Sequence, residues 1–279
     1  MTRHQRQRLH TTIIFIALLI ASAFVIVPVL WMFSTSVKTM EEMFSLPIKW
    51  IPNTISWDAY QRIWTDYPFG RYILNSFIVV SGATLISLFV SSLAGYGASR
   101  FRFLGRTAFL TFLLITQMFP SIMLLIPYFQ LMKTFGLINT YAGLIFAYIS
   151  FTIPLASWLM LGYFNSIPKE LDDAASIDGA SRWRIFWQIV MPLALPGLAA
   201  TAIYAFIVGW NEYIFALVLT TDDKMKTIPI GIGELIGQYR IAWNDMMAVS
   251  LVVSVPLTIL FLFLQRFLVS SLTAGAVKQ

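Results

Sequence analysis

The chain contains no cysteine, and its only two histidines, His4 and His10, lie within the first ten residues. Without cysteine it can form neither disulfide bonds nor thiolate metal sites. The long apolar segments therefore hold neither histidine nor cysteine, on which most hydrolase triads and many metal centres depend. No GxxxxGK[ST] motif is present either, which argues against ATP binding by this chain. These absences predict no catalytic residues, no metal site and no bound cofactor.

Charged residues are also scarce. They make up 11% of the sequence, compared with about 25% in soluble domains, whereas hydrophobic residues make up 58%. So little polar surface cannot cover a water-soluble globule, which predicts a membrane protein in contact with lipid. The net charge of +6 is consistent with attraction to anionic headgroups of the inner leaflet, and no nucleic-acid partner is implied.

Six apolar runs are long enough to cross a bilayer as helices, which requires roughly 20 residues each. They are 12–34, 73–98, 107–131, 141–164, 192–219 and 248–270. The alternating pattern of a membrane β-barrel is absent. A cleaved signal peptide is not expected, because the first run continues to Phe33 and exceeds the apolar region of about 7–15 residues in such signals. The sequence predicts an all-α membrane protein with six transmembrane helices within 12–270.

The positions of the basic residues predict the orientation. Three arginines lie in the N-terminal tail, 1–11, and three more follow the second span, with no acidic residue in either segment. Positively charged short segments favour the cytoplasm, and an even number of spans places the C-terminal tail, 271–279, on the same side. The remaining long loops then alternate: 165–191 is cytoplasmic, and 35–72 and 220–247 are extracytoplasmic.

The cytoplasmic loop 165–191 is a polar island between two apolar segments. Pro168 can open a helix, and Gly179 can end it by adopting a left-handed conformation, which predicts about three helical turns. Ser181 is in position to cap a second helix that runs toward Ile189.

Within the first helix of this loop, small and apolar residues recur at i, i+3, i+4 and i+7. These residues are Leu171, Ala174, Ala175 and Asp178, whereas Lys169, Glu170 and Asp172 are predicted to lie elsewhere. A face of small groups suits close docking against another protein. From the pattern alone, an amphipathic hairpin resting on the membrane surface is an equally good interpretation.

Three motifs in this loop carry a family resemblance. They are Asp173-Ala174-Ala175, then Gly179, then Ile189-Val190-Met191-Pro192. The pattern resembles the cytoplasmic loop of ATP-binding-cassette (ABC) importer permeases, in which the first position is usually glutamate. Asp178-Gly179-Ala180, Trp210-Asn211-Glu212 and the segment 272–278 are similar to the maltose-permease-like branch, which serves carbohydrate importers.

The resemblance implies a type I ABC importer permease fold with a cytoplasmic coupling helix that docks in a cleft of an ATPase subunit. By resemblance, Asp173 would pair with a basic group of the ATPase, and the small residues would permit close approach. The coupling residues that it implies are Glu170, Leu171, Asp173, Ala174, Ala175, Asp178 and Gly179. Further tail contacts to the ATPase are implied for Thr273, Gly275 and Lys278.

The same resemblance implies the partners. Two ABC ATPase subunits would bind ATP and Mg, and a second, homologous permease subunit would complete the transmembrane pathway. The loops 35–72 and 220–247 would meet an extracytoplasmic solute-binding protein or lipoprotein. The expected location is the plasma membrane of a bacterium or archaeon, and the expected solute is a di- or oligosaccharide.

Glu212 is the exceptional residue within the predicted spans. An ionisable group in a span costs from about 2.5 kcal/mol upward, so it usually faces a cavity or a partner side chain. Asn211, Glu212 and Tyr213 therefore line a translocation path, or else Glu212 makes an interhelical pair that holds the bundle, and both interpretations stay open. Prolines are also predicted to interrupt two spans, Pro120 and Pro127 in the third and Pro154 in the fourth.

Alternative functions are a permease for glycerol phosphates or other polyols, and a self-sufficient secondary transporter. A secondary transporter would carry ionisable residues in several spans and internal repeats, whereas Glu212 is the only acidic residue in the predicted spans and no repeat is evident. An intramembrane enzyme ranks third because catalytic groups are missing.

Overall fold

The computed structural model describes residues 3–237 and 241–276. These residues form helices throughout, apart from loops and one isolated antiparallel bridge between Ile236 and Ile241. The chain divides into two compact units, Met1–Phe69 with Ile232–Ser254, and Gly70–Gly231 with Val255–Gln279. The predicted all-α class is confirmed.

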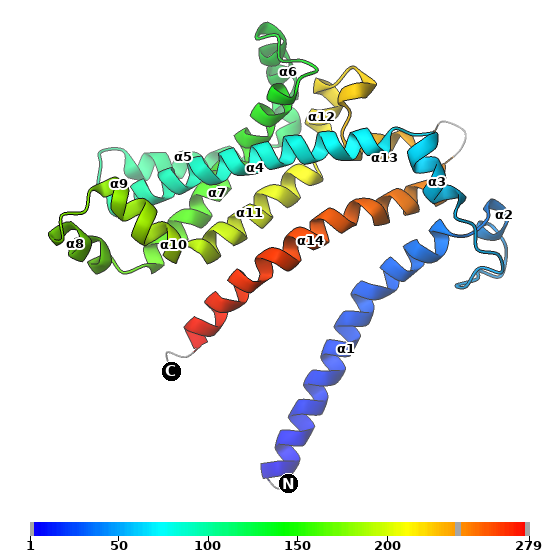
Figure 1. The fold of residues 1–279 in the computed structure, drawn as a ribbon, viewed down its shortest axis with the longest axis horizontal. Helices are drawn as coiled ribbons and strands as arrows, with labels where there is room; N and C mark the ends of the chain where they lie inside the picture. Colours follow the sequence, from blue (N-terminus) through cyan, green and yellow to red (C-terminus); the bar gives the residue numbers. More distant parts are fainter. Residues whose placement is uncertain (1–2, 238–240, 277–279) are drawn as a thin grey trace. The chain divides into compact units, whose positions relative to one another are not determined.

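The first unit contains the long helix α1 and two short helices that follow it (Figure 1). Their bounds are Arg3–Ser36 for α1, Met40–Met43 for α2 and Asp58–Thr65 for α3. This unit also holds the end of α13, Ile228–Glu234, and the start of α14, Trp243–Ala276.

The second unit is a bundle of helices built around α7 (Figure 1). The longer helices are α4 (Phe69–Arg100), α5 (Arg106–Met118), α6 (Leu125–Thr134), α7 (Tyr141–Ser166) and α11 (Leu195–Trp210). The shorter elements are η1 (Ser121–Leu124), α8 (Glu170–Ile177), α9 (Arg182–Ile185), the π-helical turn η2 (Phe186–Val190), α10 (Met191–Leu193), α12 (Ile214–Leu219) and η3 (Asp223–Met225).

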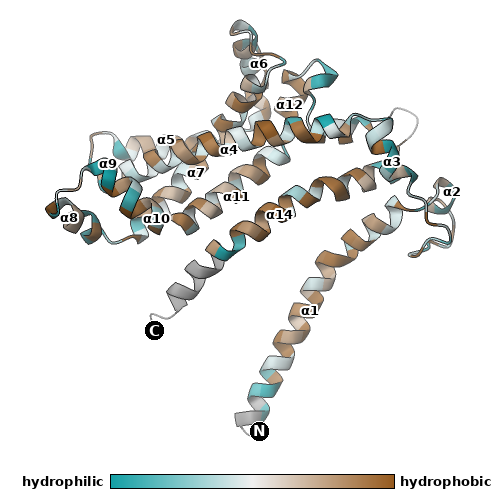
Figure 2. Cartoon of the chain, in the orientation of Figure 1, coloured by the Kyte–Doolittle hydropathy of each residue, from teal (hydrophilic) through white to brown (hydrophobic). Residues whose placement is uncertain are grey.

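Four helical segments of the described chain are long and apolar enough to cross a membrane, and Figure 2 shows their predominantly hydrophobic colouring. They are Gln7–Ser36, Phe69–Arg100, Tyr141–Ser166 and Trp243–Phe267. Two bent pairs of helices bring the number to as many as six if each pair is one span. The first bent pair, Arg106–Met118 with Ser121–Thr134, covers the third apolar run of the sequence. The second, Arg182–Leu193 with Leu195–Trp210, bends by 77° and overlaps the fifth run only as far as Trp210.

The predicted interruption of the third span, 107–131, is confirmed at Pro120. The chain bends by 95° between Arg106–Met118 and Ser121–Thr134. Phe119 is extended, with φ −78° and ψ 128°, because the residue before a proline is pushed out of the helical region by the ring of Pro120. Pro127 lies in the first turn of α6, where a proline is tolerated.

Pro154 does not interrupt the fourth span as predicted. It lies inside the continuous helix α7, where it is buried. A membrane helix tolerates proline in its interior when neighbouring groups and local adjustments satisfy the freed backbone carbonyl. The fifth predicted span, 192–219, is also broken, because α11 ends at Trp210 and α12 begins at Ile214.

Small residues bring α4 close to α7. Ser91, Gly95 and Ser99 recur every four residues along α4 and so share one face of the helix. A Cβ placed on Gly95 would lie 2.8 Å from the backbone nitrogen of Leu161 and 2.9 Å from the Cβ of Met160. Small residues at such spacing let membrane helices pack backbone to backbone.

Candidate functional site

The helix α8 forms the centre of the cytoplasmic loop predicted from the sequence. It has eight residues, about two turns rather than the predicted three, and three acidic residues in its first turn complement the positive end of the helix dipole. Gly179 ends it with φ +80°. The N–H of Ala180 donates to the carbonyl of Ala175 at 3.0 Å, and the N–H of Gly179 donates to that of Ser176 at 3.1 Å. This pair of bonds is a Schellman motif, so the prediction that Gly179 ends the helix in a left-handed conformation is confirmed.

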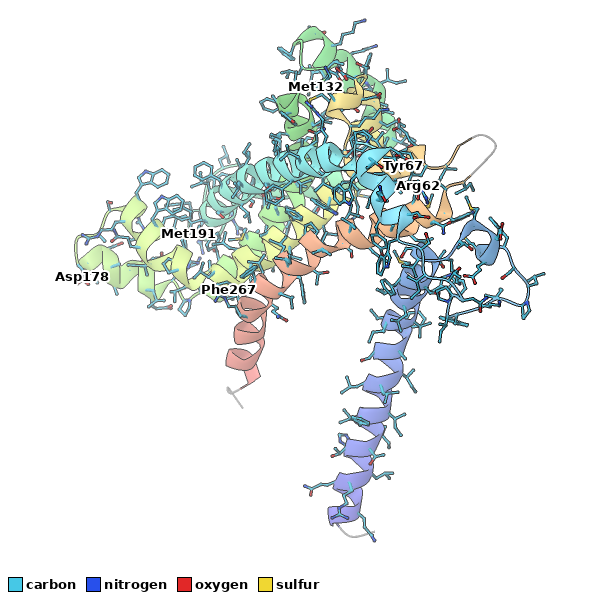
Figure 3. The ribbon with its side chains drawn as sticks, turned by 45° about the vertical axis from the view of Figure 1, so that its right-hand side comes forward. Arg62, Tyr67, Met132, Asp178, Met191 and Phe267 are labelled. Carbon is cyan, nitrogen blue, oxygen red and sulfur yellow. The ribbon has the colours of Figure 1, made fainter. Side chains whose placement is uncertain are left out.

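The second helix of the loop also begins where the sequence predicts. The Ser181 hydroxyl accepts a hydrogen bond from the N–H of Arg184 at 3.4 Å and caps α9. The helix does not continue to Ile189 in regular α form, because it passes into the π-helical turn η2 after Ile185. Figure 3 labels Asp178 at the end of α8 and Met191 at the start of α10.

Most of the predicted coupling residues are exposed on α8 and its C-terminal turn. This exposed set consists of Glu170, Leu171, Asp173, Ala174, Asp178 and Gly179. Ala175 is the exception, because it is buried in an apolar cluster that includes Phe164 and Phe186. The predicted face that joined Ala175 to Ala174 and Leu171 is therefore wrong, since Ala175 points toward the chain's own core and anchors the helix.

Asp172 lies beside Ala175 on the inward side of α8, although it was predicted as a polar residue outside the docking face. Its Oδ2 lies 2.5 Å from Nε of Arg100, and both side chains are only 5% exposed. Residues three apart share one face of a helix, so the spacing of Asp172 and Ala175 was the only local signal that Asp172 is buried together with Ala175. The sequence offered no signal that Arg100, more than 70 residues earlier, is the partner.

A cavity of about 440 Å³ opens beside the break between α11 and α12. Its lining combines aromatic rings with hydroxyl and amide groups and with Glu212. The residues are Thr116, Gln117, Phe119, Ser121, Leu124, Tyr128, Ser150, Phe151, Tyr204, Val208, Glu212 and Phe215. The Phe215 ring stacks on Phe151 with centroids 5.8 Å apart and meets the edge of Tyr128 at 5.3 Å. The cavity thus offers aromatic faces and polar groups together.

Glu212 both lines this cavity and caps α12. Its Oε1 accepts the N–H of Phe215 at 2.9 Å, and its Oε2 accepts the N–H of Ala216 at 3.0 Å. These bonds satisfy two of the backbone donors at the start of α12, which have no partner within the helix. Asn211 and Tyr213 are exposed and do not line the cavity. The break between α11 and α12 therefore places Glu212 at the cavity, but it does not place Asn211 or Tyr213 there, although all three were predicted to line one path.

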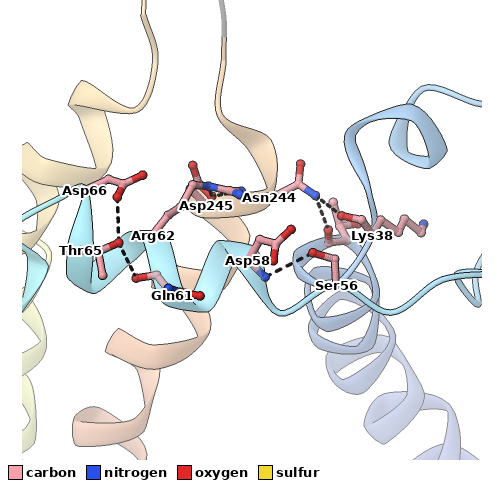
Figure 4. A network of polar contacts seen from close by, with 10 residues as sticks. Lys38, Ser56, Asp58, Gln61, Arg62, Thr65, Asp66, Asn244 and Asp245 are labelled. Carbon is pink, nitrogen blue, oxygen red and sulfur yellow. Dashed lines mark hydrogen bonds and ion pairs between the residues drawn. The ribbon is translucent and has the colours of Figure 1, made fainter.

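The two loops predicted to be extracytoplasmic meet in the first unit around a polar cavity of about 540 Å³. Figure 4 shows its central contacts. Arg62 of α3 donates to Oδ1 of Asp245 at 2.6 Å through Nη2 and at 3.0 Å through Nε. Asn244 donates from Nδ2 to the carbonyl of Lys38 at 2.5 Å. The hydrogen bond with Asp245 raises the pKa of Arg62, which strengthens the preference of the guanidinium for its charged form.

Replacing Asp245 by asparagine is expected to lower the free energy of unfolding by about 1–3 kcal/mol, because Arg62 loses a charged acceptor that is only 6% exposed. Asp223 provides the matched control, because it pairs with Lys226 but is 77% exposed. Asp223→Asn should change stability by about 0–1 kcal/mol. Thermal unfolding of the purified chain in detergent measures both variants. Equal shifts of the melting temperature would contradict a stabilising role of the buried Arg62–Asp245 pair.

The predicted tail contacts cannot be placed side chain by side chain. Thr273 and Gly275 belong to α14, but the side chain of Thr273, and Lys278 as a whole, lie outside the described residues.

Comparison with known proteins identifies the family. The family described as "Binding-protein-dependent transport system inner membrane component" matches residues 87–274. The chain is 40% identical to a trehalose/maltose transport system permease protein of Thermococcus litoralis, over 90% of this chain and 91% of that protein. It is 33% identical to a sulfoquinovosyl glycerol transport system permease protein of Agrobacterium fabrum, over 90% of this chain and 88% of that protein.

A solved structure shares the fold. A chain of a bacterial ABC transporter involved in the import of the polysaccharide alginate superimposes with a TM-score of 0.79 at 23% identity, and the match covers 95% of this chain and 98% of that one. This likeness confirms the predicted importer permease fold. With its apolar helices and the family match over most of its length, the chain belongs to the family of multi-pass inner-membrane components of binding-protein-dependent transport systems.

Proposed function

We propose that the chain is the permease subunit of an ABC importer for carbohydrates, coupled to a partner ATPase through α8. The observation that carries the proposal is the pairing of an exposed, acidic α8 with an inward face anchored in the bundle, in a chain of this family. The 40% identity with a trehalose/maltose permease supports a di- or oligosaccharide as the solute.

The exposed residues of α8 suit an ATPase cleft. Asp173 presents a carboxylate that can pair with a basic group, and Ala174 beside it permits close approach because its side chain is small. Gly179 and Asp178 complete the surface at the carboxyl end of the helix. ATP and Mg belong to two ATPase subunits, and a second, similar permease pairs with this chain. The loops around Arg62 and Asp245 are the docking region for the solute-binding protein.

The cavity beside Glu212 supports a place for this chain in the translocation path. Ligand sites are usually apolar concavities with a few placed polar groups. The rings of Tyr128 and Phe151 can cover the C–H faces of a sugar, while Gln117 and Ser150 can exchange hydrogen bonds with its hydroxyls. The path passes the break between α11 and α12, where irregular backbone is tolerated in a membrane because it borders a cavity.

Replacing Glu212 by glutamine is expected to lower sugar uptake about tenfold while the yield of the complex is unchanged. The amide keeps one acceptor oxygen but turns an N–H₂ group toward the N–H of Phe215 or Ala216, so the cap of α12 shifts at the edge of the cavity. Glu212→Asp, which keeps a carboxyl group, is the control. Unchanged uptake and unchanged complex yield in Glu212→Gln would argue against any role of this carboxylate in transport.

Glycosides of glycerol are a second candidate solute class, because the chain is 33% identical to a sulfoquinovosyl glycerol permease. Both classes are tested by ATP hydrolysis of the complete complex in lipid nanodiscs. Solute-binding protein encoded with the complex is added with a panel of disaccharides, oligosaccharides, glycerol glycosides and glycerol phosphates. Stimulation of ATP hydrolysis by a sugar supports the proposal. Stimulation by glycerol phosphate alone would show that the solute is a polyol phosphate rather than a carbohydrate.

A further inference from the structure

Arg100 and Asp172 join the last residue of a membrane-spanning helix to the helix that faces the ATPase. We propose that this pair is a positioning strut that fixes α8 to the carboxyl ends of α4 and α7, so that movement of α8 is transmitted to both. The proposal rests on the proposed function of α8. Neither residue belongs to the exposed coupling surface, because each side chain is only 5% exposed.

The guanidinium of Arg100 contacts three residues at once, in α8, in α7 and just after α7. Its Nε faces Asp172 of α8 at 2.5 Å. Its Nη1 donates to the carbonyl of Phe164 in α7 at 2.8 Å, and its Nη2 donates to the carbonyl of Ile167, just beyond the end of α7, at 3.1 Å. The carbonyl of Phe164 also accepts the N–H of Ile167 at 3.3 Å, so Arg100 adds a second donor there and donates to the carbonyl that follows the end of α7. The planar fork of arginine can do this, whereas a lysine ammonium cannot reach all three sites.

Asp172 has a second contact with α4. Tyr96, one turn before Arg100 on α4, donates its hydroxyl to Oδ1 of Asp172 at 3.4 Å. Ser99 donates to Oδ1 of Asn165 at 2.8 Å and adds a direct link from α4 to α7. Asp172 is therefore attached to α4 through two side chains.

An apolar cluster encloses the pair and fixes its geometry. Tyr96 meets the rings of Phe164 and Phe186 with centroids 5.7 Å and 4.9 Å apart, and Ala175 packs into the same cluster. Charges that interact in such a dry environment attract each other more strongly than in water, and removing one partner leaves an unpaired buried charge. The pair therefore has one favourable arrangement rather than many.

The need for such a strut follows from the length of α8. A helix of eight residues is too short to be stable by itself, so its position depends on tertiary contacts. Asp172 and Ala175 supply these contacts on the inner side, directly behind Asp173 and Ala174 on the outer side. A force applied to the outer side is thus carried to α4 and α7 through Arg100.

The test uses the full chain with two introduced labels, which is direct because no native cysteine has to be removed. Spin labels are attached at Ile177→Cys on α8, where the native side chain is 86% exposed, and at Leu159→Cys on α7, where it is 39% exposed. The distance distribution between the labels is compared in the parent, in Asp172→Asn and in Asp173→Asn. The two variants change the same residue type at adjacent positions.

We expect a narrow distribution in the parent and in Asp173→Asn, and a broad one in Asp172→Asn. A distribution in Asp172→Asn as narrow as that of the parent would overturn the proposal. If Asp172→Asn does not accumulate in the membrane, Arg100→Lys takes its place, because it keeps a cation but loses the fork. A parent-like distribution in Arg100→Lys would then overturn the proposal, and a broadened one supports it.

Activity of the reconstituted complex adds a readout that a purely structural role would not move. With trehalose as the transported probe, the amount of sugar imported per ATP hydrolysed is expected to fall about tenfold in Asp172→Asn while ATP hydrolysis persists. Equal loss of hydrolysis and import would contradict transmission through the pair. If no ATPase binds the parent chain, the proposed function fails, whereas the label distances still decide whether the pair positions α8.

Discussion

Replacing Gly179 by aspartate is expected to abolish solute uptake, by about a hundredfold or more, while the protein still reaches the membrane. Gly179 has φ +80°, a conformation that costs most L-residues about 1–2 kcal/mol. The new carboxylate would also lie at the negative end of the α8 dipole, next to Asp178. Both effects act on the exposed end of α8 and leave the apolar spans unchanged. Uptake by whole cells and the amount of protein in isolated membranes measure the two parts of this prediction.

Asparagine at the same position is the matched control. It has the size of aspartate without its charge, and it tolerates the left-handed conformation better than most residues. A Cβ at Gly179 would meet nothing within 4 Å, so the control adds no steric clash within this chain. Gly179→Asn should therefore retain a measurable fraction of uptake. Full uptake with full ATPase coupling in Gly179→Asp would refute the assignment of α8 as the coupling element.

Replacing Gly95 by alanine is expected to destabilise the chain by about 1–3 kcal/mol through overpacking between α4 and α7. The added Cβ would meet the backbone of Leu161 at 2.8 Å, and a helix backbone cannot move aside as a flexible side chain can. The helices must separate, which also weakens the contacts that Ser99 and Arg100 make with α7. The melting temperature of the purified chain and its yield in complex with partner subunits should both fall.

Gly97 supplies a control within the same helix. A Cβ at this position would meet nothing within 4 Å. Gly97→Ala should therefore be neutral or should stabilise the chain by up to about 1 kcal/mol, because alanine favours the helix more than glycine does. Equal melting temperatures for the two variants would show that α4 and α7 do not approach as closely as described.

Local signals in the sequence predicted α8 and its boundaries well. Gly179 ends one helix and Ser181 caps the next, and each does so through hydrogen bonds with residues close in the sequence. Their roles can therefore be predicted without knowing the fold. Pro120 acted in the same local way, but its effect is a 95° bend rather than a kink within one span. Pro154 shows the limit of this logic, because the surrounding helices keep α7 continuous.

Long-range pairings could not be predicted. Arg100 and Asp172, or Arg62 and Asp245, are brought together only by the packing of distant helices, and no spacing in the sequence marks them as partners. For the same reason Ala175 was assigned to the docking face. Its periodicity fits Ala174 and Leu171, but the side that faces the bundle depends on where α4 and α7 lie.

The central claim is that this chain transports a carbohydrate only in a complex powered by a partner ATPase. The most direct test is to purify the chain from its native membrane in mild detergent, identify the proteins that accompany it, and measure ATP hydrolysis with sugar-loaded binding protein. The account predicts that an ABC ATPase and a second permease accompany the chain and that one sugar stimulates hydrolysis. A chain that purifies alone and carries solute along an ion gradient would contradict it.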